Sequence, residues 1–242
     1  MKKILLMATL VVNPALFASE AIGFYSKGQL QKAQSVFEHG TAIHKLFVAR
    51  KRLYTTDEMH KVLTDASDFL HSTFPEAEVL QVGDLSLKDG GLAEGHASHQ
   101  NGLDADIVYL RNNGYVQPVE SKSWEEDFVL NQSPSKNFNL ERNFSLFKHF
   151  VKSAPVGRIF VDIALKRSLC EFAQKSGDLK KAETIQVLRR LRPANLHRTH
   201  FHLRLDCDPS DNECTKQSAP AEGAGCDELS LMLELATGEN AC

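Results

Sequence analysis

Half of the histidines in this chain lie in two short clusters whose residue types suit metal-dependent hydrolysis. The clustered residues are His96, His99, His197, His200 and His202. Two carboxylates, Asp104 and Asp106, follow the first cluster closely. A neutral imidazole nitrogen and a carboxylate oxygen both bind Zn²⁺, and a catalytic zinc site has three protein ligands and one open position. A histidine that is not a ligand could move protons between water and a leaving amine. The two clusters together therefore predict a zinc-dependent hydrolase.

Strand alternation explains how the second cluster would act as a unit. Residues 199–205 alternate between polar and apolar types, which predicts a strand with His200, His202 and Arg204 on one face. Their neighbouring Cβ atoms would lie roughly 7 Å apart, twice the rise per strand residue. Such alternation divides a buried face from a functional or solvated face. We expect Arg204 to be an ion-pair partner rather than a catalytic group.

The first cluster leaves a glycine-rich turn and runs into a second predicted strand, residues 102–110. Asp104 and Asp106 would share one face of that strand. Asp104 has two open interpretations: it braces a histidine behind the metal, or it ends the turn. The HExxH helix motif of zinc proteases is absent, so the ligands would come from strands and loops. A single histidine is more often a surface or core residue, and the prediction depends on both clusters together.

The remaining patterns predict a mixture of helices and strands around these clusters. Residues 111–139 are polar, rich in turn residues and carry the chain's sole tryptophan, Trp124, which predicts a surface excursion that forms a wall of the substrate groove or a mobile flap. Apolar spacing predicts amphipathic helices over residues 56–70, 140–151 and 182–191. Strands are predicted over residues 77–82 and 158–163, and residues 22–54 are read as strands or packed loops.

Length, charge and the N-terminus indicate an exported protein with one domain. The chain has 242 residues with a formal net charge of −3, and 42% of its residues are hydrophobic, which is typical of a globular protein and suggests no nucleic-acid partner. The N-terminus combines two lysines, a short apolar run and small residues typical of a cleavage site. Residues 1–18 are therefore predicted to be a signal peptide, cleaved between residues 18 and 21. The alternative is a buried N-terminal helix. No stable membrane insertion is expected, and residues 19–242 would form a single domain.

All five cysteines lie in the last third of the sequence, which agrees with export to an oxidising compartment. Cys207 and Cys214 flank a polar loop and could close a short disulfide ring. Free thiols are the alternative. A four-cysteine zinc ribbon is disfavoured because no CxxC pair occurs.

Taken together, the motifs resemble those of the penicillin-insensitive murein endopeptidase family over most of the predicted mature chain. They are Gly95-His96-Ala97-Ser98-His99-Gln100-x-Gly102-Leu103-Asp104-x-Asp106-Ile107, Leu191-Arg192-Pro193, and His197-Arg198-x-His200-x-His202-x-Arg204-Leu205-x-Cys207. The resemblance implies an α+β fold with a small central antiparallel β-sheet that carries the zinc site, flanked by helices and long loops. It also implies a periplasmic enzyme of the wider group that includes lysostaphin-type endopeptidases and D-Ala-D-Ala dipeptidases.

The implied reaction is hydrolysis of the D-alanyl-diaminopimelate cross-link of murein (peptidoglycan), with no serine acyl-enzyme and hence no sensitivity to penicillin. His200 would act as general base and then acid, and His197 would support it or help to hold the transition state. The family's aromatic pair after the Arg-Pro is Ala194-Asn195 here, so the groove could be wider and the specificity altered. The alternatives are a D-Ala-D-Ala carboxypeptidase or LD-endopeptidase of the same group, or a non-catalytic zinc-binding protein that docks on murein.

The resemblance assigns the zinc ligands as His99, Asp106 and His202, with His96 at or beside the metal. Many relatives carry an aspartate and a histidine for a second zinc in the following loop. The comparable stretch here, residues 133–137, contains neither residue type. We therefore expect one zinc ion per chain.

The resemblance also implies two disulfide bonds in the C-terminal tail. These are Cys170 with Cys226 and Cys207 with Cys214. The family's N-terminal cysteine is replaced by Gln29 in this chain, which would leave Cys242 unpaired.

Overall fold

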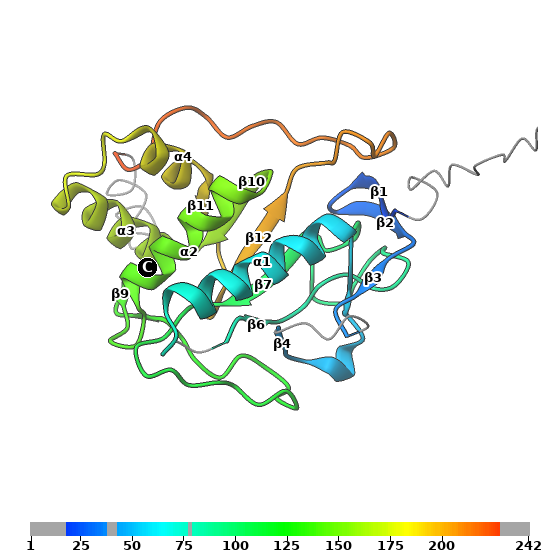
Figure 1. Cartoon of the computed structure of the whole chain (residues 1–242), viewed down its shortest axis with the longest axis horizontal. Coiled ribbons are helices and arrows are strands. Elements are labelled where there is room, and N and C mark those ends of the chain that lie inside the picture. The colour runs from blue at the N-terminus through cyan, green and yellow to red at the C-terminus, as the bar shows by residue number, and fades with distance from the viewer. Residues whose placement is uncertain (1–17, 38–42, 77–78, 228–242) are drawn as a thin grey trace, which may run out of the picture.

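The computed structural model describes residues 18–37, 43–76 and 79–227, and its centre is a six-stranded sheet (Figure 1). In spatial order the sheet consists of β11 (Leu191–Pro193), β10 (Val156–Val161), β12 (His200–Leu205), β7 (Asp104–Val108), β6 (Gln81–Val82) and β4 (His44–Lys45). The helices are α1 (Asp57–Thr73), α2 (Leu140–Ser153), α3 (Ile163–Lys175) and α4 (Ala182–Arg190), with a 3₁₀ turn at Val48–Arg50. Three two-stranded ribbons complete the described elements: β1 (Glu20–Phe24) with β2 (Lys27–Gln31), β3 (Gln34–Ser35) with β5 (Tyr54–Thr55), and β8 (Val129–Leu130) with β9 (Ser133–Pro134).

The α+β class is confirmed, and the sheet is antiparallel across its four central strands, β10, β12, β7 and β6. The two edge strands differ from the expectation, because β11 runs parallel to β10 and β4 runs parallel to β6. The chain connects each parallel pair through helices: α3 and α4 lie between β10 and β11, and α1 lies between β4 and β6. Parallel neighbours need such long crossovers, so the edge geometry follows from the helical connections.

The three predicted helices are present, and α1 illustrates why they form. The Thr56 hydroxyl accepts a hydrogen bond from the Met59 N–H, which caps the helix, and Asp57 and Glu58 place negative charge in its first turn. Helix α3 was not predicted, and it corrects the strand expected over residues 158–163. That strand ends at Val161, because the Asp162 side chain accepts from Ala164 N–H and starts the helix.

Helix α1 crosses in front of β12 and β7, with α2 beside it (Figure 1). The rings of Phe147 and Phe150 on α2 lie 5.0 and 6.1 Å from the ring of Phe201 on β12. The odd-numbered residues of β12 therefore face the helices. Since side chains alternate along a strand, the even-numbered residues face the other way.

Both predicted disulfide bonds are present in the tail. They join Cys170 to Cys226 and Cys207 to Cys214. The first ties the tail to α3, and the second closes the short ring expected from the polar loop. Residues 1–17, Ala77 at the start of the strand predicted over residues 77–82, and Cys242 lie outside the described residues. Within the described part of the chain, no helix has both the length and the apolar character needed to cross a membrane.

Candidate metal centre

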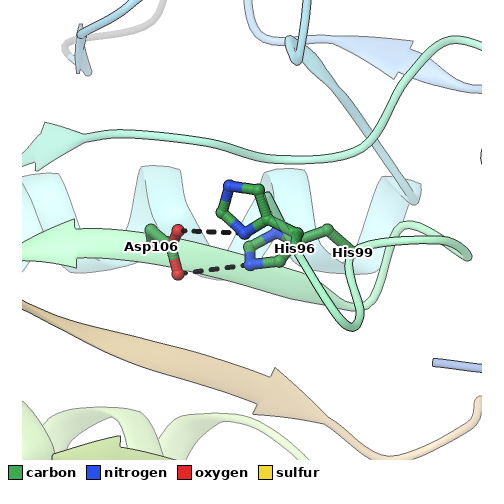
Figure 2. Close-up of side chains that lie close together, drawn as sticks. All are labelled: His96, His99 and Asp106. Atoms are coloured by element: carbon green, nitrogen blue, oxygen red, sulfur yellow. Dashed lines mark ion pairs between the residues drawn. The ribbon is translucent and has the colours of Figure 1, made fainter. Parts of the chain in front are cut away.

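The pairing of β7 with β12 brings the two histidine clusters to one place. In this register His202 is opposite Asp106, and Arg204 is opposite Asp104. The loop that precedes β7 carries His96 and His99. Both side chains point toward Asp106 (Figure 2). One ligand atom of each of His96, His99 and Asp106 lies within 4.8 Å of the others.

One carboxylate oxygen, Oδ1 of Asp106, is the meeting point of three imidazoles. His99 Nε2 lies 3.2 Å from it, His202 Nδ1 lies 3.5 Å from it, and His200 Nε2 lies 3.6 Å from it. His96 Nδ1 lies 3.9 Å from the other oxygen of Asp106, Oδ2. The ligand atoms of a tetrahedral zinc site lie roughly 3.3–3.6 Å apart, because each is about 2.0–2.2 Å from the ion. The distances from Asp106 to the nitrogens of His99, His200 and His202 are close to this range, so these atoms could share a metal ion with Asp106.

Several of these buried polar atoms have no partner among the described residues. Neither ring nitrogen of His99 has a hydrogen-bond partner there, and neither has Oδ1 of Asp106. Both side chains are about 1% exposed. An unpaired buried polar atom costs about 1–3 kcal/mol, and a cation between these atoms would remove that cost. The donor set is thus suited to a metal that binds imidazole nitrogen and carboxylate oxygen.

Asp104 fixes the ring orientation of His202. Its Oδ1 lies 2.8 Å from His202 Nε2, and a carboxylate can only accept, so Nε2 carries the proton. The unprotonated Nδ1 then faces Asp106, as a metal ligand requires. Asp104 also accepts from the His99 N–H and from two guanidinium nitrogens of Arg204. Of the two interpretations of Asp104, the structure favours the brace, and Arg204 is the ion-pair partner that we expected.

Asp84 orients His96 in the same way. Its Oδ2 accepts from His96 Nε2 at 3.0 Å, which leaves Nδ1 of His96 unprotonated and directed toward Asp106. The same oxygen accepts from Arg50 at 2.8 Å and from Arg52 at 2.9 Å. Burial would raise the pKa of Asp84, but the hydrogen bond from His96 and the charge of Arg50 outweigh it and lower the pKa to about 2.

The charges at the centre are strongly coupled. Burial would raise the pKa of Asp106, but the charges of His99 and His200 hold it well below its usual range. Burial would lower the pKa of His99, and the charge of Asp106 reverses this and raises it. For His202 the burial effect prevails, and its pKa is lowered. Negative charge is therefore concentrated on Asp106 within a ring of imidazoles.

His200 has different surroundings from His202, although both approach Asp106. Its Nδ1 lies 2.9 Å from the Thr199 hydroxyl and has no carboxylate partner like that of His202. Its ring stacks on the indole of Trp124 with centroids 4.4 Å apart and an angle of 12° between the planes. Burial lowers the pKa of His200 to about 4, against the opposing charge of Asp106. A neutral His200 can accept a proton at its unprotonated ring nitrogen.

His197 lies beside these rings, at 5.3 Å from His200 and 6.0 Å from His202 between ring centroids. Its Nδ1 donates to the carbonyl of Asn195 at 2.6 Å, which leaves Nε2 free to interact with another group. Unlike the other members of the second cluster it is not buried.

A cleft of about 700 Å³ opens over the cluster. Besides the clustered residues, it is lined by Arg50, Arg52, Glu94, Trp124 and Leu196. The structure thus brings together every histidine singled out in the sequence, and it places part of the 111–139 excursion, through Trp124, in the wall of the cleft.

Two contributors to this site carried no assigned role in the sequence. Asp84 lies two residues after the end of β6, in the segment Val82-Gly83-Asp84, where a carboxylate in the turn after a predicted strand was the available signal. Trp124 lies in a polar excursion, and nothing in its neighbourhood along the chain indicates a contact with His200.

Comparison with known proteins agrees with the motif resemblance. The family model of penicillin-insensitive murein endopeptidases matches residues 21–240. The penicillin-insensitive murein endopeptidase of Pectobacterium atrosepticum is 29% identical over 228 residues, which cover 89% of this chain and 75% of that protein. Those of Klebsiella pneumoniae and Escherichia coli are 28% and 29% identical over 220 residues, covering 89% of this chain and 77% of each relative.

Proposed function

Because this chain belongs to the penicillin-insensitive murein endopeptidase family, and is thus a peptidase, we propose that it hydrolyses the D-alanyl-diaminopimelate cross-link of peptidoglycan in a zinc-dependent reaction. The observation that carries the proposal is the convergence of three imidazoles on one unpaired oxygen of Asp106 at the base of a cleft. That arrangement offers more nitrogen donors than a three-ligand zinc site needs.

In this proposal His99, Asp106 and His202 hold one zinc ion, with His96 at or beside it. Their unprotonated atoms face one another, and Asp104 and Asp84 orient two of the rings from behind. A bound zinc ion supplies Lewis acidity, which polarises the scissile carbonyl and lowers the pKa of water toward about 7. The remaining steps belong to side chains of this chain.

His200 is proposed as the group that moves protons. Its neutral ring accepts a proton at Nε2 from the attacking water and then donates that proton to the amine that leaves. His197, through Nε2, would support His200 or help to hold the transition state. The Asn195 carbonyl holds His197 by its other nitrogen, so the ring can serve this purpose without turning.

The proposal includes the cellular context. Residues 1–18 would direct export, cleavage would fall between residues 18 and 21, and residues 19–242 would work as a single periplasmic domain. Two disulfide bonds are compatible with an oxidising compartment. The partner is the peptide cross-link of peptidoglycan.

The test is digestion of purified cross-linked muropeptides, with and without a chelator. We expect monomers to be released without free D-alanine, and we expect a chelator to stop the reaction until zinc is restored. Penicillin should have no effect. Free D-alanine as the main product would indicate the carboxypeptidase alternative, and cleavage at an L,D bond would indicate the LD-endopeptidase alternative. A zinc-loaded chain that cleaves nothing would indicate the non-catalytic docking protein.

Two variants separate the proposed roles. His200→Ala should lose at least about 100-fold in kcat while one zinc per chain is retained, because its role is proton transfer. His202→Ala should lose zinc as well. His149→Ala is the control, since that ring stacks on Phe69 at 4.2 Å, away from the cluster. Equal loss of zinc in both cluster variants would contradict this division of roles.

A further inference from the structure

The stack between Trp124 and His200 joins a loop residue to the proposed proton carrier, and nothing in the family resemblance accounts for it. The two rings are nearly parallel, with 12° between their planes and 4.4 Å between their centroids. Such an offset between aromatic faces is a favourable contact that also fixes the relative orientation of the rings. We infer that Trp124 is a positioning residue, which holds the imidazole of His200 in the orientation needed for proton transfer.

The surroundings of the indole show that space is reserved for it. A Cβ atom added to Gly83 would lie 2.2 Å from Cη2 of Trp124, so a side chain at that position would collide with the ring. The buried ring of Phe47 packs edge-on against the indole, with centroids 4.7 Å apart and 83° between planes. The indole of Trp124 is therefore packed between Gly83, Phe47 and His200, which are distant from one another in the sequence.

The backbone on both sides of Trp124 is held by a buried amide. Gln117, which is 0% exposed, donates from Nε2 to the carbonyl of Ser123 at 2.9 Å and accepts at Oε1 from the Glu125 N–H at 3.3 Å. Arg50 donates to the carbonyl of Lys122, one residue further back. The residues next to Trp124 are thus anchored independently of the indole, as precise placement of a ring on a loop requires.

His200 lacks the carboxylate support that two of the neighbouring imidazoles have. His202 and His96 are each held by a carboxylate, through Asp104 and Asp84. The Nδ1 atom of His200 contacts the hydroxyl of Thr199, its own neighbour in the chain. For His200, the indole face supplies the orienting contact that a carboxylate supplies to His202 and to His96.

The inference rests on the proposed function, and the first experiment measures catalysis. Trp124→Phe retains a planar ring, whereas Trp124→Leu retains apolar bulk without one. We expect Trp124→Leu to lower kcat by about 10- to 100-fold with little change in KM and one zinc per chain, since a displacement of about 1 Å can cost that much. Trp124→Phe should recover most of the loss. Leu130→Ala, on the same excursion and 65% exposed, is the control and should change neither constant.

Two results of that experiment would overturn the inference. Equal kcat values for the Leu and Phe variants would mean that Trp124 only fills space. A rise in KM at unchanged kcat would mean that it contacts the substrate instead of orienting His200.

A second measurement does not depend on any activity. Trp124 is the only tryptophan in the chain, so its fluorescence reports on this one contact. His200→Ala in the full chain should shift the emission to the red and increase quenching by acrylamide, because one face of the indole becomes open to solvent. His149→Ala should leave the spectrum unchanged. An unchanged spectrum in His200→Ala would refute the stack itself. A changed spectrum in a chain that cleaves no muropeptide would refute the proposed function while the contact stands.

Discussion

The two halves of the cleft are built in different ways. The strand half, made by β7 and β12, carries Asp104, Asp106, His200, His202 and Arg204 on paired strands, where backbone register sets every position. The loop half, made by residues 83–99 and 111–139, carries His96, His99 and Trp124. Its positions are set by side chains such as Gln117, which bonds the backbone around Trp124.

The contrast shows two solutions to one requirement, which is to hold an imidazole or an aromatic ring within a fraction of an ångström. In the strand half, buried charge does this, since Asp104 is held by Arg204, whose guanidinium lies 4.0 Å from the centroid of the Tyr25 ring. In the loop half, the buried carboxylate of Asp84 holds His96, whereas the neutral amide of Gln117 holds the backbone around Trp124. We therefore expect the buried charge of the strand half to dominate global stability and to support the metal through His202, and the segment around Trp124 to control catalytic precision.

The largest effect should follow from Asp104→Asn. This change leaves Arg204, which is 6% exposed, without its buried counter-charge, and loss of one member of a buried pair costs about 3–5 kcal/mol. It also removes the carboxylate behind His202, so zinc affinity should fall by about 10- to 100-fold. Denaturant unfolding and zinc titration measure the two effects.

A second substitution separates charge from ligand support. Asp104→Asn combined with Arg204→Met should regain much of the stability, because no unpaired charge is left, but it should not regain zinc affinity. Asp65→Asn is the surface control. It removes the exposed partner of Lys61 and should change stability by less than about 1 kcal/mol. If Asp104→Asn cost no more than this control, the strand half would not depend on buried charge.

The sequence predicted the strand half well and the loop half poorly, for a physical reason. Strict alternation along residues 199–205 was enough to put His200, His202 and Arg204 on one face, because period two is a local property of the backbone. The register that pairs β12 with β7 is not local and was not predicted, and the family resemblance implied only that His99, Asp106 and His202 share a metal ion. The two disulfide pairings were reached through the family resemblance.

Long-range contacts explain what remained hidden. Trp124 contacts His200 across 76 positions of the chain, and Asp84 serves His96 from the end of another strand. No pattern within a loop encodes such a partner. The boundary between β10 and α3 was missed for a local reason, since Asp162 ends the strand and caps the helix with no turn residues between them.

Lys45, a buried lysine that contacts the backbone of the loop half at Gly83, should make the free energy of unfolding depend on pH. Lys45 is 3% exposed, and its ammonium donates to the carbonyls of Leu46 and Gly83. Burial lowers its pKa to about 8, although the charges of Asp84 and Asp106 oppose the shift. Between about pH 8 and pH 10.5 the folded chain has released this proton while the unfolded chain still holds it. The unfolded state then binds more protons, so the free energy of unfolding rises with pH.

The comparison that isolates this effect is Lys45→Met against the unchanged chain, both in chelator. The unchanged chain should gain about 2–3 kcal/mol more than the variant between pH 8 and pH 10.5. Lys61→Met, which removes an exposed lysine, should follow the unchanged chain. Parallel pH curves for Lys45→Met and the unchanged chain would mean that Lys45 is not held in a desolvated site.

The smallest effect on stability should come from Gln117→Ala. This variant also tests whether the loop half can be weakened without affecting the strand half. The change leaves the Ser123 carbonyl and the Glu125 N–H without their partner, at a cost of about 1–2 kcal/mol. Because neither atom belongs to the strand half, zinc affinity should stay the same. Catalysis should fall by about tenfold, since Trp124 would lose its fixed backbone.

Amide hydrogen exchange would show where the loss is localised. In Gln117→Ala, residues 118–127 should exchange faster while β7 and β12 keep their protection, because local opening of a loop need not involve the paired strands. Gln132→Ala, at an exposed position of the same excursion, should leave both regions unchanged. If β7 and β12 lost protection together with the loop, the two halves would open as one cooperative unit. Precision at His200 and retention of the metal would then share a single source of stability, and the division drawn between the halves would be wrong.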